Sequence, residues 1–287
     1  MKTNISLVAL EKLTEIFNKN GWSIEDHREE YDRFCQALEH FSPEQQGLIF
    51  ELTREFLWVT LNKYESYLYA SLFMIEKKLL VDCNKIYILP LQSYPEKREN
   101  ETRNESAIFT RYLIKISHLS NNDLFRGKKI CLIDSPLAIP KDINFIPAML
   151  ILVDDFIGSG ETGETAVKDM CRLAGITDYN KILVVSLVAQ EMGVQRLSRL
   201  GIRVFSRIIR KRGISDSYLN PERETKSRIM ESIESLIKVK KKYNFGYNRT
   251  EALVAMMSRT PNNTFPVYWC ENSMENGKKF IAPFSAG

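Results

Sequence analysis

The sequence predicts an α/β fold in which helices cover both faces of a central, mainly parallel sheet. Between about residues 85 and 210, short apolar runs alternate with segments of helical periodicity. The apolar runs lack the polar–apolar alternation of a half-solvated strand, so both faces of the sheet are expected to be buried. Composition agrees, because 44% apolar and 26% charged residues are typical of a globular domain and argue against a disordered chain.

The first 82 residues are predicted to form a helical extension. Ser42 and Pro43 in "SPEQ" begin a helix as its N-cap and first helical residue. From Pro43 to Leu80, apolar and aromatic residues recur at helical spacing without a further proline, which predicts one long helix or two in line. Its apolar face suits packing against a core, and a platform for a partner protein is the alternative.

Strands and helices then follow in order through residues 83–210, the predicted α/β core. The expected strands are 85–91, 128–134, 148–154, 181–189 and 202–209, and the expected helices between them are 105–117, 163–175 and 193–201. A helix at about 222–240 opens a third segment, 211–287, which is expected to form a C-terminal helical or hood region. The predicted domains are therefore 1–82, 83–210 and 211–287.

Several features indicate a cytoplasmic protein. The five cysteines lie far apart and form no C-x-x-C pair, so neither a zinc site nor a disulfide framework is indicated. His27, His40 and His118 have no metal-ligand spacing and are interpreted as structural or surface residues. No apolar run approaches the roughly 18 residues of a membrane span, and the N-terminal apolar stretch is too short for a signal peptide.

Basic residues cluster in two segments, "RIIRKR" at 207–212 and "KVKKK" at 238–242. The net charge of +4 is too small to indicate nucleic-acid binding by itself. Each segment fits a solvated surface, and lysines at 238–242 would also be favoured by the dipole at a helix C-terminus. A nucleic-acid contact through these segments is the alternative.

The stretch after the predicted strand 148–154 has the features of a phosphate-binding loop. Gly158 and Gly160 follow the strand, and a helix is expected to begin near Thr162. Backbone N–H groups of a glycine loop, together with a helix N-terminus, form a cradle for an anion. Ser159 and Thr162 add hydroxyl donors, so this loop is predicted to bind a phosphate.

Asp154 and Asp155, which immediately precede this loop, predict a second contact on the same ligand. Carboxylates do not bind a phosphate directly, but they accept hydrogen bonds from vicinal hydroxyls or hold Mg²⁺ through water. Phosphate donors a few residues from diol acceptors fit a ribose 5-phosphate. The carboxyl end of a strand in an open α/β sheet is also where ligands bind.

Two other phosphate loops fit the sequence less well. The G-x-x-x-x-G-K-[ST] loop needs a lysine, and none lies between Asp154 and Lys168. Gly158, Gly160 and Gly163 match the dinucleotide pattern G-x-G-x-x-G. That pattern, however, places its acid about 20 residues after the loop rather than before it.

At these residues the sequence "LILVDDFIGSGET" (150–162) resembles the phosphoribosyl-diphosphate (PRPP) motif of type I phosphoribosyltransferases. The α/β pattern from about 85 to 210 extends the resemblance. It implies that Asp154 and Asp155 are catalytic, bind the ribose hydroxyls and hold Mg²⁺ indirectly, through water. It assigns the 5-phosphate to the loop residues Gly158, Ser159, Gly160, Glu161 and Thr162. Gly158 stands where many family members carry Ser, Thr or Asp, which argues against ordinary purine salvage.

The same resemblance gives a role to the loop after strand 85–91, which binds diphosphate in the family. Here that segment reads "LQSYPEKREN" at 91–100, with a helix expected from 105. Lys97, Arg98 and Arg103 are the side chains that could neutralise a diphosphate. A solvated charged loop is the alternative.

The C-terminal stretch "GYNRTEALVAMMSRTPNNTFPVYW" (246–269) resembles the tail of bacterial phosphoribosyltransferase-like proteins from conflict and phage-defence loci, including retron operons. The resemblance implies an effector whose partners are a winged-helix protein and a reverse transcriptase with its RNA–DNA product. Tyr247, Phe265 and Trp269 would line a hood over a base, and Asn262 and Asn263 would contact its polar edges. A turn at "TPNNT" packed on an aromatic core is the alternative.

Two functions therefore remain open from the sequence. One is an enzyme that binds PRPP or a related nucleotide with Mg²⁺ and transfers or cleaves at the ribose C1. The other is a non-catalytic module that senses a ribose phosphate and acts through a protein or nucleic-acid partner. The acceptor, the trigger and homo-oligomerisation are not determined by the sequence.

Overall fold

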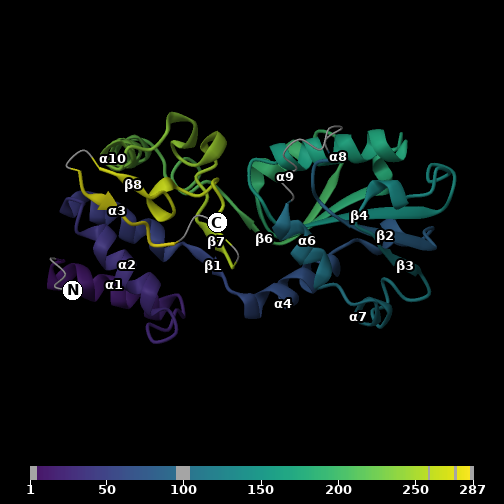
Figure 1. Ribbon diagram of the computed structural model, residues 1–287, viewed down its shortest axis with the longest axis horizontal. Helices are drawn as coiled ribbons and strands as arrows, with labels where there is room; N and C mark the ends of the chain where they lie inside the picture. The colour runs from purple at the N-terminus through teal and green to yellow at the C-terminus, as the bar shows by residue number, and fades with distance from the viewer. Residues whose placement is uncertain (1–4, 95–103, 258, 275–276, 285–287) are drawn as a thin grey trace. The chain divides into compact units, whose positions relative to one another are not determined.

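The chain forms two compact units in the computed structural model, which describes residues 5–94, 104–257, 259–274 and 277–284. The terminal unit combines Met1–Val59 with Lys211–Gly287, and the central unit is Thr60–Arg210 (Figure 1). One unit boundary lies between Arg210 and Lys211, and residues 60–82 lie in the central unit. The division into 1–82, 83–210 and 211–287 stays a prediction. Within the described residues, no helix is long and apolar enough to cross a membrane.

The central unit contains a five-stranded sheet in the order β3-β2-β4-β5-β6. All neighbouring strands in it are parallel. The strands are β2 (Lys85–Pro90), β3 (Lys129–Leu132), β4 (Ala148–Ile157), β5 (Ile182–Gln190) and β6 (Arg203–Arg210). The predicted α/β class is confirmed. Strand β4 runs three residues beyond its expected end at Asp154, so both acids lie within the strand.

Helices cover both faces of this sheet, as Figure 1 shows, with α4 and α6 on one face and α8 and α9 on the other. The helices of the central unit are α4 (Leu61–Leu72), α5 (Lys77–Leu80), α6 (Glu105–Tyr112), α7 (Ile116–Ser120), α8 (Glu161–Ala174) and α9 (Glu191–Ser198). Leu150 and Val184 of the sheet pack with Val167 and Met170 of α8, and all four are at most 1% exposed. Burying side chains of this size contributes about 1.5–3 kcal/mol each.

The expected helical run from Pro43 to Leu80 is interrupted by a short strand. Helix α3 (Pro43–Arg54) begins at the predicted Ser42 capping box, but β1 (Leu57–Val59) separates it from α4. Strand β1 pairs in parallel with β7 (Val254–Met256), near the other end of the chain. The helical spacing of local apolar residues therefore gave the wrong prediction for 57–59, because the pairing that decides their conformation is non-local.

The terminal unit is built from both ends of the chain. It contains α1 (Leu7–Lys19), α2 (Arg28–Leu38), α3, α10 (Glu222–Leu236), the β1–β7 pair and the hairpin of β8 (Asn272–Ser273) with β9 (Lys279–Phe280). One aromatic cluster joins these segments: Phe34 of α2 contacts Tyr268 and Phe284, and Phe56 stacks on Phe284 with ring centroids 5.1 Å apart. The N-terminal helices and the C-terminal segment thus share one core.

Candidate functional site

The loop between β4 and α8 consists of Gly158, Ser159 and Gly160. Gly160 is the N-cap of α8 and has a φ of 76°, a left-handed conformation that glycine adopts without strain. The N-terminus of α8, a 14-residue helix, therefore follows directly on the loop. Ser159 is only 6% exposed and accepts a hydrogen bond from the backbone N–H of Glu161 at 3.4 Å, whereas Thr162 is exposed.

A second glycine-containing turn packs directly on this loop. A Cβ atom added to Gly193, in α9, would lie 2.3 Å from the carbonyl oxygen of Gly158. A Cβ added to Gly160 would lie 2.8 Å from the carbonyl oxygen of Gly193. The two backbones can approach this closely only because both residues lack side chains. The sequence did not predict a role for Gly193, since only the folded sheet brings the end of β5 beside the end of β4.

Asp154 is held by the start of α6. Its carboxylate, in a residue 6% exposed, accepts hydrogen bonds from Asn104 Nδ2 at 2.9 Å, Ser106 Oγ at 3.1 Å and the backbone N–H of Asp155 at 2.8 Å. Asn104 is also the N-cap of α6, where its side chain accepts from the N–H of Ala107. Burial and the neighbouring charge of Asp155 raise the pKa of Asp154 well above its usual range.

Asp155 is held by a different helix. Its carboxylate accepts a hydrogen bond from the hydroxyl of Tyr64 in α4 at 2.9 Å. Asp155 is 4% exposed and Tyr64 is 1% exposed, so the contact is shielded from water. Protein hydroxyl and amide groups therefore donate hydrogen bonds to the two acids. The hydroxyls of a bound ribose are predicted to donate to the same carboxylates. Sequence reasoning missed Tyr64, Asn104 and Ser106, since their segments are distant from the motif along the chain.

Further polar atoms near the carboxyl ends of the strands lack partners. Gln92, just after β2, and Ser186, which is opposite Asp154 in the β4–β5 register, each have a buried side-chain oxygen without a hydrogen bond to any residue the structure describes. Buried polar atoms are generally satisfied by protein, water or ligand. Their presence around Asp154 is consistent with a site that gains partners when a polar ligand or water enters.

The model of the PRTase-CE family matches residues 24–284, which span both units of the chain. The chain belongs to the PRTase-CE family. A search of curated proteins gave no match. Among solved structures, a purine phosphoribosyltransferase from Pyrococcus horikoshii matches with 13% identity and a TM-score of 0.27, covering 47% of this chain and 79% of that one. A similarity this low does not assign an activity.

In this PRTase-CE protein, two cationic side chains, Lys168 of α8 and Arg196 of α9, are paired with an acid. Glu164, in the first turn of α8, accepts hydrogen bonds from Lys168 Nζ and Arg196 Nε, each at 2.6 Å. These two partners lower the pKa of Glu164 to about 2. The anion cradle predicted for the loop therefore relies on backbone N–H groups and hydroxyls rather than on these side chains.

The remaining predicted contacts of the PRTase-CE protein are those with a diphosphate and those with a base. Lys97, Arg98 and Arg103 lie outside the described residues, so their contact with a diphosphate stays a prediction. Tyr247, Asn262, Asn263 and Trp269, the predicted hood, lie in the terminal unit.

Hydrogen bonds within the terminal unit already use several groups of this predicted hood. Asn263 Nδ2 donates to the carbonyl of Tyr247 at 3.3 Å, Trp269 Nε1 donates to the carbonyl of Thr264 at 2.8 Å, and the carbonyl of Asn262 accepts from the N–H of Tyr247 at 2.8 Å. Such contacts are those of a packed turn, and contact of these residues with a base stays a prediction.

Proposed function

We propose that this phosphoribosyltransferase-like protein binds PRPP or a related ribose-phosphate nucleotide at the β4–α8 loop of the central unit. One observation carries the proposal. Asp154 and Asp155 occupy the carboxyl end of β4, and the left-handed Gly160 directly precedes the N-terminus of α8. The helix end favours the 5-phosphate, and the carboxylates can accept from the ribose hydroxyls.

In the enzymatic form of the proposal, the protein transfers or cleaves at the ribose C1. The transition state of such a reaction is oxocarbenium-like, so the residues act by holding the ribose and excluding water rather than by forming a covalent bond. Asp154 and Asp155 hold the sugar hydroxyls, and Ser159 and Thr162 hold the phosphate. Each contact fixes the ribose, and with it the C1 atom, relative to the leaving group.

Magnesium fits this site only together with the ligand. Among the described residues, no group of three or more His, Cys, Asp or Glu side chains could hold a metal ion. Tyr64, Asn104 and Ser106 also donate to the two acids. Mg²⁺ would therefore be held by the diphosphate of the ligand and, through water, by the carboxylates, where it would neutralise the departing diphosphate.

A sensing module is the second candidate, and the partners of the acids favour it. A ribose diol must replace or share the hydrogen bonds from Tyr64 of α4 and from Asn104 and Ser106 at α6. One hydrogen bond to a carboxylate is exchanged for another, so the net change in binding free energy is small. The exchange nevertheless releases the side-chain donors on α4 and α6 from the two acids. Ligand binding would then be coupled to α4 and α6 without any chemical step.

The biological setting is proposed from the C-terminal resemblance: an effector of a bacterial anti-phage, retron-type system, acting in the cytoplasm. Its partners would be a winged-helix protein and a reverse transcriptase with its RNA–DNA product. The basic segment 207–212 begins on β6, an edge strand, with Arg207 exposed. Nucleic-acid contact would use this charge, although charged side chains also protect an edge strand from pairing with another chain.

Incubation of the full chain with PRPP or a panel of nucleotides and Mg²⁺ tests the proposal and separates its two forms. Release of diphosphate or free base, abolished in Asp155→Asn, is expected for the enzyme. Saturable binding without any product is expected for the sensor. If the protein neither binds nor consumes any ribose 5-phosphate compound, both forms of the proposal fail.

A further inference from the structure

The segment 238–249 of the terminal unit concentrates positive charge on the surface. No ion pair joins its cations to a carboxylate of any residue that the structure describes. The acids that flank the segment in sequence, Glu234 and Glu251, are 2% and 1% exposed and hydrogen-bonded inside the unit, so they present no carboxylate to solvent. The exposed cations are Lys238, Lys240, Lys241, Lys242 and Arg249.

Two of these cations occupy backbone positions that favour glycine. Lys238, which follows the C-terminal end of α10, has a φ of 53°, and Arg249 has a φ of 52°. Both values lie in the left-handed region, where a side chain is sterically strained and glycine is not. The chain therefore keeps a cation at each position in spite of the strain, as is common where the side chain contacts a ligand.

Aromatic rings lie among these cations. The ring centroid of Tyr243 is 5.4 Å from that of Trp269 and 6.4 Å from that of Tyr247, and Lys242 Nζ lies 4.8 Å from the centroid of Tyr243. All three rings are partly exposed. The short helices Lys241–Tyr243 and Tyr247–Arg249 also contact each other. Segment 238–249 and Trp269 thus form one surface, the basic aromatic surface.

We propose that the basic aromatic surface binds a single-stranded nucleic acid. Unpaired cations favour a polyanion, whose bound counterions they release. Partly exposed rings favour unpaired bases, which stack on aromatic side chains, whereas the faces of paired bases are covered within a duplex. An anionic membrane is disfavoured, because no large apolar side chain in the fully described stretch 235–251 is exposed for insertion.

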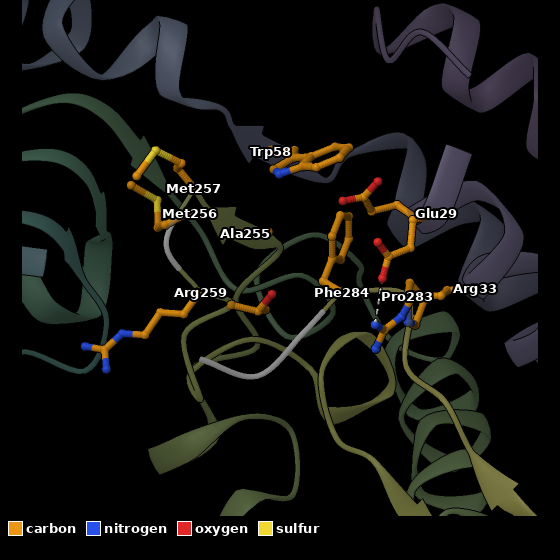
Figure 2. Close-up of a pocket in the computed structure, with 11 residues that line it drawn as sticks. Glu29, Arg33, Trp58, Ala255, Met256, Met257, Arg259, Pro283 and Phe284 are labelled. Atoms are coloured by element: carbon orange, nitrogen blue, oxygen red, sulfur yellow. Dashed lines mark ion pairs between the residues drawn. The ribbon is translucent and has the colours of Figure 1, made fainter. Parts of the chain in front are cut away.

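The pocket of the terminal unit does not offer the same chemistry. Its lining includes Glu29, Glu30, Arg33 and Arg259, so acids and arginines balance (Figure 2). Arg33 is also engaged within the protein, since its guanidinium pairs with Glu29 at 3.5 Å and its Nε donates to the carbonyl of Ala282 at 2.8 Å. The charge of this pocket therefore gives no preference for a polyanion.

Fluorescence anisotropy with the full chain tests the proposal. The probe is an oligothymidylate of about 12 nucleotides, a length within the range that single-strand-binding surfaces cover. It has hydroxyl ends, so it carries no 5-phosphate monoester for the β4–α8 loop. We expect it to bind at least about tenfold more tightly than a duplex of the same length, because only the single strand gains stacking. Vesicles of phosphatidylserine should not bind.

Exchange of two lysines tests the contact with phosphate. Lys241→Gln/Lys242→Gln should weaken the oligothymidylate and reduce the slope of log K against log salt concentration by about 1.4, because each phosphate contact on a single strand contributes about 0.7. Lys12→Gln/Lys19→Gln removes the same charge from exposed positions of α1 and should leave the slope unchanged.

Exchange of one ring tests the contact with bases. Tyr243→Leu should weaken the oligothymidylate by about tenfold or more, through lost stacking, and leave the salt slope unchanged. Tyr243→Phe keeps the ring and should bind like the wild type, which shows that the position tolerates exchange. Tyr179→Leu, a tyrosine 37% exposed in the central unit, is the matched control.

Three results would overturn the proposal: no binding of the oligothymidylate, equal binding of the duplex, or equal behaviour of the variants and their controls. Binding of the vesicles in place of the oligothymidylate would assign the surface to a membrane and would also overturn it. Excess ribose 5-phosphate should not compete with the oligothymidylate. The proposal therefore stands or falls separately from the ribose-phosphate site.

Discussion

At the residue scale, the two acids of β4 are stabilised by donors from different helices. Asp154 accepts from Asn104 and Ser106 at the start of α6, and Asp155 accepts from Tyr64 in α4. Leaving a buried carboxylate without its donor costs about 1–3 kcal/mol or more. A ligand hydroxyl that replaces such a donor recovers that energy, so these contacts can be tested through both stability and binding.

Tyr64→Phe should destabilise the protein while improving its affinity for ribose 5-phosphate. Loss of the hydroxyl leaves Asp155 without this donor, at a cost of about 1–3 kcal/mol in the free energy of unfolding. The ribose hydroxyl then meets an unsatisfied carboxylate and no longer competes with Tyr64. Urea unfolding and calorimetry measure the two effects. Tyr67→Phe, on the same helix, is the control. Weaker binding in Tyr64→Phe would instead mean that Tyr64 orients Asp155 for the ligand.

Gly193→Ala should displace the loop of residues 158–160, although it replaces none of the loop's own residues. The added methyl group would lie 2.3 Å from the carbonyl oxygen of Gly158, so the loop or α9 must move, at a cost of about 1–3 kcal/mol. Both the melting temperature and the affinity for inorganic phosphate should fall. Gly163→Ala, whose new methyl meets atoms no closer than 3.4 Å, is the control. Equal phosphate affinities in the two variants would show that the close approach does not shape the loop.

At the scale of secondary-structure elements, local pattern predicted the parallel sheet well. Runs such as 148–153 and 182–189 are apolar apart from Ser186, and the corresponding strands are buried on both faces. The local spacing of apolar residues gave the wrong prediction where a strand far along the chain decides the conformation, as at β1, which pairs with β7.

The candidate site likewise contains some residues that local sequence pattern predicts and others that it does not. Its loop and acids are consecutive in the sequence and were predicted. Tyr64, Asn104, Ser106 and Gly193 reach the loop or its acids only through tertiary packing, and no local pattern marks such contacts.

Helix α10 contains a buried acid that should make stability depend on pH. Glu234 is 2% exposed; one carboxylate oxygen accepts from the N–H of Phe245 at 2.8 Å, and the other has no hydrogen bond with a described residue. Burial raises the pKa of Glu234 from 4.5 to about 8. The folded state therefore retains a proton that the unfolded chain releases, so the stabilising effect of this proton is lost as pH rises from about 5 to about 8.

Glu234→Gln should remove this pH dependence. The stability of the wild-type protein relative to the variant should fall with pH, by up to about 1.4 kcal/mol per unit between roughly pH 5 and 8. Glu231→Gln, an exposed neighbour on the same helix, should follow the wild type. Urea unfolding at a series of pH values provides the comparison. Parallel profiles for wild type and Glu234→Gln would contradict a proton held at this carboxyl.

At the scale of the whole molecule, the family match extends over both compact units rather than over the sheet alone. The terminal unit joins the two ends of the chain in one core, so its N-terminal helices cannot be treated as a separable extension. All five cysteines are free thiols, and Cys35, Cys83 and Cys171 are buried. Nothing in this arrangement makes folding depend on oxidation.

Stability should accordingly be insensitive to reductant. The melting temperature of the full chain should be the same with and without dithiothreitol, because no disulfide constrains the unfolded state. Differential scanning fluorimetry on freshly reduced and air-exposed protein checks this. A fall of many degrees in dithiothreitol would reveal a structural bridge between cysteines that are free in this structure.

The central claim is that the β4–α8 loop binds a ribose 5-phosphate. Two variants test its phosphate contact and its ribose contact separately. Thr162→Val removes a hydroxyl donor to the phosphate, so it should weaken ribose 5-phosphate and PRPP alike, by about ten- to a hundredfold. Asp155→Asn should spare inorganic phosphate, which has no diol, and weaken the ribose compounds together with any Mg²⁺ dependence.

Calorimetric titration of the wild type and both variants with inorganic phosphate, ribose 5-phosphate and PRPP is the most direct measurement. We expect Thr162→Val to weaken all three ligands, because each carries a phosphate, and Asp155→Asn to weaken only the two that carry a ribose. If neither variant changes any of the three affinities, the loop is not a ribose-phosphate site and the account is contradicted.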